Sequence, residues 1–173
     1  MSGVQLAAEG EPTPVHVIFV CMGNICRSPM AAAVLRHELE QAGLHHVAVS
    51  SAGTGGWHVG DPADRRTRSA LQRRGYETDH VARQFGSDWF ANDQLVVAMD
   101  RDNLRDLRRL APSREHADGI RLMLEFDPDA ETLDVPDPYY GAASDFDSVL
   151  DEIERACRGL VAHLQESVAA PQT

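Results

Sequence analysis

A cysteine and an arginine lie six residues apart where a predicted strand meets a predicted helix. Cys21 follows the apolar run Val15 to Val20, and Arg27 precedes Ser28-Pro29, a pair typical of a capped helix start. A thiolate is a nucleophile, and a planar guanidinium can hold two oxygens of a phosphoryl group. The pair therefore predicts phosphoryl transfer through a covalent cysteine intermediate.

The loop between these two residues is suited to bind an anion. It leaves the carboxyl end of a strand and enters a helix N-terminus, so backbone N–H groups and the positive end of the helix dipole converge. Gly23 supplies backbone freedom, and Asn24 tolerates a left-handed conformation well. We expect these donors and Arg27 to favour the thiolate of Cys21, and the hydroxyl of Ser28 to donate to its sulfur.

The charge balance restricts the ligand. The 173 residues carry 16 Lys+Arg, all of them arginine, against 27 Asp+Glu, for a formal net charge of −11. The lack of lysine excludes Schiff-base chemistry and the lysine of a Walker loop. The acidic balance argues against nucleic acid as a partner. The eight histidines show no metal-ligand spacing, so neither a metal nor a cofactor is expected.

Short β-branched runs alternate with stretches of helical period, which predicts an α/β fold with a parallel sheet. The predicted strands are Val15 to Val20, Val47 to Ser51, Gln94 to Met99 and Ile120 to Phe126. The predicted helices begin near Ser28, Arg65, Asn103 and Ser144.

Residues 1–14 lack both a basic start and an apolar core, so they predict a disordered leader and not a signal peptide. Residues 15–170 are predicted to form a single domain. No apolar run approaches the roughly 20 residues that span a bilayer, so no membrane partner is expected. Three cysteines favour a reducing, cytoplasmic compartment, and a monomer is the default.

The loop segment resembles the phosphate-binding signature of the low-molecular-weight protein tyrosine phosphatases throughout: Cys21-Met22-Gly23-Asn24-Ile25-Cys26-Arg27-Ser28-Pro29. The similarity extends through Ser51-Ala52-Gly53-Thr54, His80-Val81-Ala82-Arg83-Gln84, Met99-Asp100 and Asp137-Pro138-Tyr139-Tyr140-Gly141. Trp57-His58-Val59-Gly60 resembles an actinobacterial secreted phosphatase, which places the chain in the bacterial branch and raises export without a signal peptide as a second localisation.

The resemblance implies a fold and a reaction. The fold is a four-stranded parallel twisted sheet in the order 2-1-3-4 with helices on both faces, and the phosphate-binding loop joins the first strand to the first helix. The reaction is hydrolysis of phosphotyrosine monoesters in proteins through a cysteinyl phosphate, without a cofactor. A bacterial tyrosine kinase is a candidate partner. Phosphate and substrate contacts are implied for Met22, Gly23, Asn24, Ile25, Cys26 and Ser28.

Asp137 is the general acid by this resemblance. A carboxyl group on a proline-stiffened loop can give a proton to the leaving oxygen and, once ionised, can activate water. Six acids fall within residues 125–140, and such runs are usually solvated. The Asp-Pro-Tyr-Tyr sequence favours catalysis over that alternative.

Trp57 and Tyr139 are predicted to form the aromatic walls of a slot. Such walls would select the flat phosphotyrosine ring, which is long enough to reach Cys21, over the shorter phosphoserine. The resemblance also makes Tyr139 and Tyr140 candidate phosphorylation sites. The nearby arginines, Arg65, Arg66 and Arg68, are expected to attract an acidic phosphopeptide.

Three further residues are implied as supports. By resemblance, His80 hydrogen-bonds Asn24 and holds the loop rigid with help from Ser51, and Asp100 orients Arg27.

The role of Cys26 stays open. It is close enough to Cys21 in sequence for a reversible disulfide that would protect the nucleophile from over-oxidation, and it also fits a small buried thiol.

Two other functions compete with hydrolysis. An arsenate reductase on the same fold needs two further cysteines on a mobile segment, but none lies between Glu77 and Asp100 and Cys157 has no partner. A phosphotyrosine-binding module without turnover would be expected to lack the nucleophile or the acid, and both are present.

Overall fold

The computed structural model describes residues 15–91 and 94–169. Its centre is a four-stranded parallel sheet in the order β2-β1-β3-β4. The predicted fold class and strand order are confirmed, while the predicted leader, residues 1–14, lies outside the described residues. The strands are β1 (Val15–Cys21), β2 (Val47–Gly53), β3 (Gln94–Ala98) and β4 (Arg121–Leu122).

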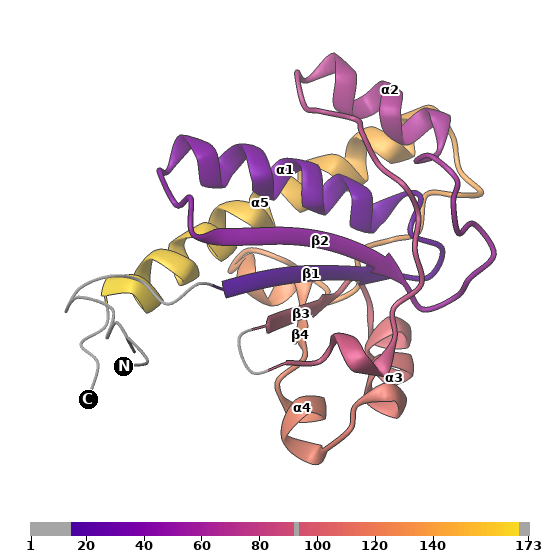
Figure 1. Ribbon diagram of the computed structural model, residues 1–173. Coiled ribbons are helices and arrows are strands. Elements are labelled where there is room, and N and C mark those ends of the chain that lie inside the picture. The colour runs from indigo at the N-terminus through magenta and orange to yellow at the C-terminus, as the bar shows by residue number, and fades with distance from the viewer. Residues whose placement is uncertain (1–14, 92–93, 170–173) are drawn as a thin grey trace, which may run out of the picture.

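Helices cover both faces of this sheet. Figure 1 shows α1, α2 and α5 on one face and α3 and α4 on the other. The α-helices are α1 (Arg27–Gln41), α2 (Arg65–Arg73), α3 (Arg101–Leu110), α4 (Arg114–Asp118) and α5 (Ala143–Ala169). Two 3₁₀ helices are η1 (Ser87–Trp89) and η2 (Met123–Phe126).

The pleat of β1 divides its side chains between two cores. Val17, Phe19 and Cys21 belong to the cluster that includes side chains of α1 and α5. Ile18 and Val20 belong to the cluster beneath α3. Successive strand residues point to opposite faces, and both faces of a parallel sheet are covered, so the strand is apolar almost throughout. The same alternation sets the face on which the cysteine side chain lies.

The last strand is shorter than predicted. The apolar run Ile120 to Phe126 was expected to be one strand, but only Arg121–Leu122 pairs with β3 before the chain turns into η2. The turn carries Met123, Leu124 and Phe126 into the core with α5. Periodicity alone cannot separate a buried strand from a buried helical turn, which explains the error.

The first helix starts one residue before the predicted cap. Helix α1 begins at Arg27, and its N-cap residue, Cys26, makes no side-chain capping bond. Ser28 therefore lies inside the first turn and is fully buried. Its hydroxyl oxygen contacts two residues of the loop, Cys21 and Asn24.

Gly159 of α5 lets this helix pack closely on η2. A Cβ atom there would overlap the carbonyl oxygen of Phe126. Replacing a helical glycine by alanine usually stabilises a protein by up to about 1 kcal/mol. We expect Gly159→Ala instead to lower the free energy of unfolding by about 1–3 kcal/mol, as overpacking does. Urea denaturation measures this.

Gly119→Ala is the matched control, because a Cβ there would meet its nearest atom, the Glu115 carbonyl oxygen, at an ordinary 3.4 Å. Equal effects of the two substitutions on the free energy of unfolding would contradict the packing argument.

Candidate active site

The phosphate-binding loop starts where β1 ends. Asn24 has a φ of 57°, the left-handed conformation that its short amide side chain tolerates. Two bonds tie the start of the loop to the segment after β2: Thr54 N–H donates to the carbonyl of Cys21 (2.9 Å), and Gly55 N–H to that of Met22 (3.0 Å). A Cβ on Gly53 would come within 2.7 Å of the Met22 carbonyl oxygen, so this approach requires glycine.

Asn24 holds the loop from behind. Its amide nitrogen donates to the hydroxyl oxygens of Ser28 (2.8 Å) and Ser51 (3.0 Å), and its amide oxygen accepts from the backbone of Arg83 (2.9 Å). The Nε2 of His80 lies 2.7 Å from the Asn24 carbonyl oxygen. Burial lowers the pKa of His80, although this hydrogen bond opposes the effect. A neutral imidazole with its proton on Nε2 fits the contact.

Cys21 and Ser28 face each other. The sulfur lies 2.9 Å from the Ser28 hydroxyl oxygen, and only 3% of the cysteine is exposed. That oxygen already accepts from Asn24, and its own hydrogen can go to the sulfur or to the Ala52 carbonyl oxygen, which lies farther away at 3.5 Å. The arrangement supports the negative charge of a thiolate.

Arg27 is a buried cation at the edge of the loop, with 2% exposure. Its Nη1 donates to Asp100 Oδ2 (2.6 Å) and to the Val135 carbonyl (3.0 Å). Its Nη2 lies 3.7 Å from Asp137 Oδ2. Burial lowers the pKa of Arg27, but the charges of Cys21 and Asp100 outweigh burial and raise it. The guanidinium is therefore held charged and oriented.

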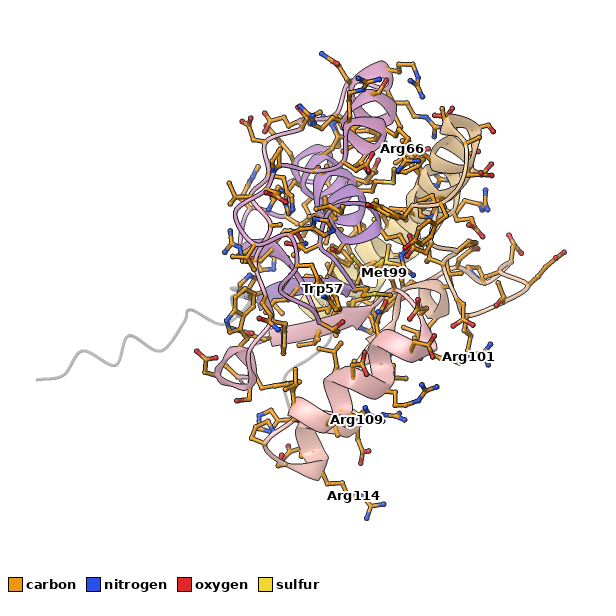
Figure 2. The ribbon with its side chains drawn as sticks, turned by 90° about the vertical axis from the view of Figure 1, so that its right-hand side faces the viewer. Trp57, Arg66, Met99, Arg101, Arg109 and Arg114 are labelled. Carbon is orange, nitrogen blue, oxygen red and sulfur yellow. The ribbon has the colours of Figure 1, made fainter. Side chains whose placement is uncertain are left out.

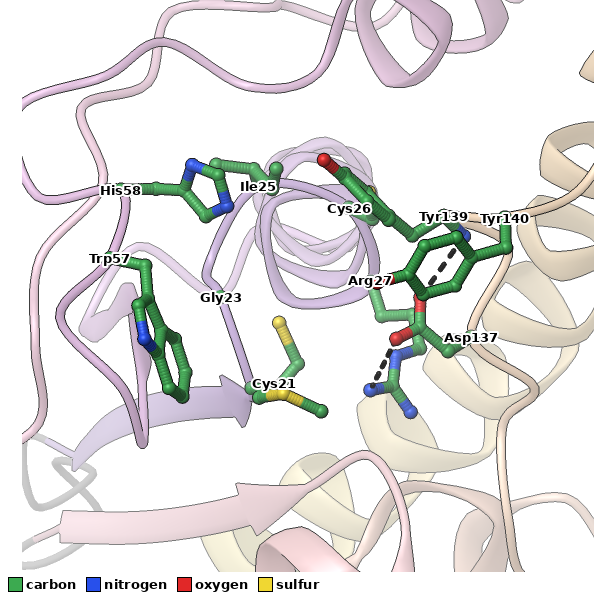
Figure 3. A pocket seen from close by; sticks show the side chains of 11 residues that line it. Cys21, Gly23, Ile25, Cys26, Arg27, Trp57, His58, Asp137, Tyr139 and Tyr140 are labelled. Atoms are coloured by element: carbon green, nitrogen blue, oxygen red, sulfur yellow. Dashed lines mark hydrogen bonds and ion pairs between the residues drawn. The ribbon is translucent and has the colours of Figure 1, made fainter.

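These groups meet in one cavity of about 300 Å³. Figure 3 shows Trp57 and His58 on one side of it and Tyr139 and Tyr140 on the other, with Cys21 between them. The lining residues are Cys21, Met22, Gly23, Ile25, Cys26, Arg27, Trp57, His58, Asp137, Tyr139 and Tyr140.

The predicted site residues occupy two layers. Most of them line the cavity, whereas Asn24 and Ser28 are fully buried behind it. Ser51 and His80 contact Asn24, and Asp100 contacts Arg27. The structure thus brings the predicted set together, with Ser51, His80 and Asp100 outside the lining of the cavity.

His58 lines the cavity although the sequence did not mark it as a site residue. Its Nδ1 lies 3.3 Å from Asp61 Oδ2, and its ring centroid lies 6.5 Å from that of Tyr139. A Cβ on Gly23 would sit 3.2 Å from the His58 ring, so the glycine also makes room for this side chain. Its position next to Trp57 was the available signal.

Among the residues that the structure describes, no group of three or more His, Cys, Asp or Glu could hold a metal ion. No helix within the described ranges is long and apolar enough to cross a membrane.

Comparison with known proteins shows the family. The model of the family described as low molecular weight phosphotyrosine protein phosphatase matches residues 16–170. The chain belongs to the low molecular weight protein tyrosine phosphatases. A low molecular weight protein-tyrosine-phosphatase of Streptomyces coelicolor is 53% identical over 156 residues, covering 88% of this chain and 95% of the relative. The resemblance seen in the sequence is confirmed.

Solved structures of low molecular weight phosphatases share the fold. A protein tyrosine phosphatase of Entamoeba histolytica, with Hepes in its active site, matches with a TM-score of 0.84 and 38% identity, covering 88% of this chain and 97% of that one. A Drosophila arginine phosphatase, DARP, matches with a TM-score of 0.79 and 31% identity, covering 85% and 96%. Within this one fold, therefore, the amino acid that carries the phosphate differs.

The two thiols in the phosphate-binding loop of this phosphatase, Cys21 and Cys26, should differ in reactivity. Burial raises the pKa of Cys26 to about 12, which disfavours its thiolate, the reactive form, at neutral pH. We expect iodoacetate near neutral pH to label Cys21 and leave Cys26 unmodified, as mapped by peptide mass spectrometry. The Cys21→Ser variant should then take up no label in the loop. Equal labelling of both cysteines would contradict this assignment.

His80 should make the stability of this phosphatase depend on pH. Burial lowers its pKa in the folded state below the ordinary 6.5, so the unfolded chain takes up the proton first as the pH falls. The His80 contribution to stability is therefore present above about pH 6.5 and is lost on acidification below it. We expect His80→Gln, which can still donate to Asn24, to flatten this loss in urea titrations at pH 5–8. Parallel pH profiles for the two proteins would disprove the role.

Proposed function

We propose that this phosphatase hydrolyses phosphotyrosine in proteins through a phosphocysteine on Cys21. The observation that carries the proposal is the convergence of the Cys21 thiol, the Arg27 guanidinium and the Asp137 carboxyl on one cavity. The three groups supply a nucleophile, a clamp for the phosphoryl oxygens and a proton donor, which are the parts that metal-independent phosphoryl transfer needs.

In the first step the thiolate of Cys21 attacks phosphorus. The S–P bond forms while the bond from phosphorus to the phenolic oxygen breaks, and Asp137 in its acid form gives its proton to that oxygen. Because Nη1 of Arg27 is engaged by Asp100 and Val135, its Nε and Nη2 edge can face two phosphoryl oxygens. Tyrosine leaves as the neutral phenol.

In the second step water attacks the phosphocysteine. The Asp137 carboxylate takes a proton from the water, the new P–O bond forms and the S–P bond breaks. The hydroxyl of Ser28, 2.9 Å from the sulfur, stabilises the departing thiolate. Inorganic phosphate is released, and both Cys21 and Asp137 return to their starting states.

The walls of the cavity support selectivity for phosphotyrosine. Trp57 is 72% exposed, Tyr139 37% and Tyr140 94%, so much of the surface of these aromatic walls is open to a ligand. A flat phenyl ring can stack between these walls while its phosphate reaches the loop. A phosphoserine side chain is too short to gain both contacts.

The competing functions have less support. For arsenate reduction the candidate relay cysteine, Cys157, is fully buried in α5, and burial raises its pKa, so it cannot serve as an exposed relay thiol. A binding module without turnover leaves the placement of Asp137 beside the cavity unexplained. DARP is named an arginine phosphatase, so phosphoarginine is the rival substrate that the test must include.

We further propose a cytoplasmic monomer whose partners are phosphotyrosine proteins, a bacterial tyrosine kinase among them. Three free, buried cysteines, one of them the nucleophile, support a reducing compartment. The half-exposed Tyr139 and the exposed Tyr140 are accessible to such a kinase, so we propose both as phosphorylation sites.

Phosphopeptides of one sequence carrying phosphotyrosine, phosphoserine or phosphoarginine test the proposal. We expect phosphotyrosine to give the highest kcat/KM, with activity retained in a chelator. Cys21→Ser should abolish turnover, and Asp137→Asn should lower kcat roughly 100- to 10,000-fold with little change in KM. Phosphate release measures all three. A preference for phosphoarginine would overturn the substrate class, and turnover by Cys21→Ser would overturn the mechanism.

A further inference from the structure

We propose that Arg66 is a positioning residue for the general acid. The segment of residues 134–141, here called the acid loop, carries Asp137 over the cavity. Arg66 lies near the start of α2, more than seventy residues earlier in the chain. It holds the part of this loop that is C-terminal to Asp137. The inference rests on the proposed function, because it assigns Asp137 the role of proton donor.

Two backbone contacts carry the inference. Arg66 Nη2 donates to the Tyr139 carbonyl (2.8 Å), and Nη1 donates to the Gly141 carbonyl (3.1 Å). Both carbonyls follow Asp137 in the chain. One planar guanidinium therefore fixes two points of the same loop, which restricts its rotation as well as its position.

Arg66 is itself held in place before it contacts the loop. Asp64 accepts from Nε (3.1 Å) and from Nη2 (3.1 Å), and it also caps α2 by accepting from the Arg66 backbone. The guanidinium lies 4.4 Å from the ring centroid of Phe146, a fully buried residue of α5. The geometry of Arg66 is thus preorganised. The sequence analysis expected Arg66 to attract an acidic phosphopeptide, but its guanidinium is already occupied by Asp64 and the acid loop.

The same contacts join the acid loop to the phosphate-binding loop. The backbone N–H of Asp64 donates to the carbonyl of Ile25 (2.9 Å). A continuous path therefore runs from Ile25 through Asp64 and Arg66 to Tyr139. It sets the distance between the loop that holds the nucleophile and the loop that holds the acid.

The part of the acid loop that is N-terminal to Asp137 has separate anchors. Val135 donates its N–H to the Met99 carbonyl (2.9 Å) and accepts from Arg27 (3.0 Å), and the carboxylate of Asp134 pairs with Arg101 (2.9 Å). Figure 2 shows Arg66 near α2 and α5, and Arg101 at α3. Asp137 lies between these anchors, so losing Arg66 would release one side only.

The Asp137 carboxyl depends on this restraint because its own contacts are few. It is 39% exposed, lies 3.7 Å from Arg27, and accepts from the Tyr139 N–H (3.1 Å). That last bond closes a tight turn that ends at Tyr139, the residue whose carbonyl Arg66 holds. A shift of the turn moves the carboxyl, and a misplacement of about 1 Å can slow a reaction roughly 100-fold.

Leaving-group dependence separates acid positioning from a general loss of structure. A proton donor matters most when the leaving oxygen is basic, as in phenyl phosphate, and least for 2,4-dinitrophenyl phosphate. For Arg66→Ala we expect kcat/KM to fall roughly 10- to 100-fold with phenyl phosphate and about 2-fold or less with the dinitrophenyl ester. Arg66→Lys keeps the charge but loses the planar guanidinium that contacts two carbonyls. It should give a smaller loss of kcat/KM with the same dependence on the leaving group.

Arg73→Ala is the matched control. Arg73 also lies on α2, and its guanidinium contacts Ser69 (2.8 Å) and Asp147 of α5 (2.7 Å), both of which lie outside the acid loop. We expect near wild-type kcat/KM with both esters. If Arg66→Ala does not fold, Arg66→Lys carries the same comparison.

Asp137→Asn distinguishes failure of this inference from failure of the proposed function. If Asp137→Asn shows the leaving-group pattern and neither Arg66 variant does, or if those variants slow both esters equally, Arg66 is only structural. If Asp137→Asn lacks the pattern, the acid assignment itself is wrong. In the Asp137→Asn background, Arg66→Ala should add no further leaving-group dependence, and an added dependence would also overturn the inference.

Discussion

The buried charge of Arg27 organises the reaction centre. A guanidinium that is 2% exposed has lost almost all of its water and is stable only with partners of opposite charge and polarity. Those partners are Asp100 and the Val135 carbonyl, which begin α3 and the acid loop. Asp100 also caps α3 by accepting from the Asn103 N–H (2.7 Å). One desolvated cation thus brings together the ends of β1 and β3 and the segment that delivers the acid.

The phosphate-binding loop needs side-chain contacts to hold its shape. Its backbone N–H groups must face an anion, so they are not available to donate to the carbonyl groups of the loop itself. Asn24 supplies the missing restraint from behind through its contacts with Ser28, Ser51 and Arg83. These contacts hold the loop from the side opposite the cavity. That arrangement leaves the cavity side free for substrate.

Arginine appears in two different electrostatic roles around the cavity. Arg27 is buried, and the proposed reaction uses the edge of its guanidinium that Asp100 and Val135 leave open to bind the phosphoryl group. Arg66 is partly exposed and directs its fork to the protein, where Asp64 and two backbone carbonyls occupy it. In a chain of net charge −11 without lysine, both of these arginines have defined acceptors within the protein. Local pairing, and not net charge, therefore decides whether the cavity can bind an anion.

The sequence by itself determined the parts that are contiguous. The strand, the glycine and asparagine of the loop, and the first turn of the helix lie within fifteen residues, and the two-residue period of a strand assigns each side chain of β1 to a face. The family motifs then predicted the acid and its supports. Only the tertiary structure decided the short β4, the buried position of Ser28, the place of His58 in the cavity and the contacts of Arg66. Each of these depends on contacts between distant segments or on exact helix ends, which local residue patterns do not encode.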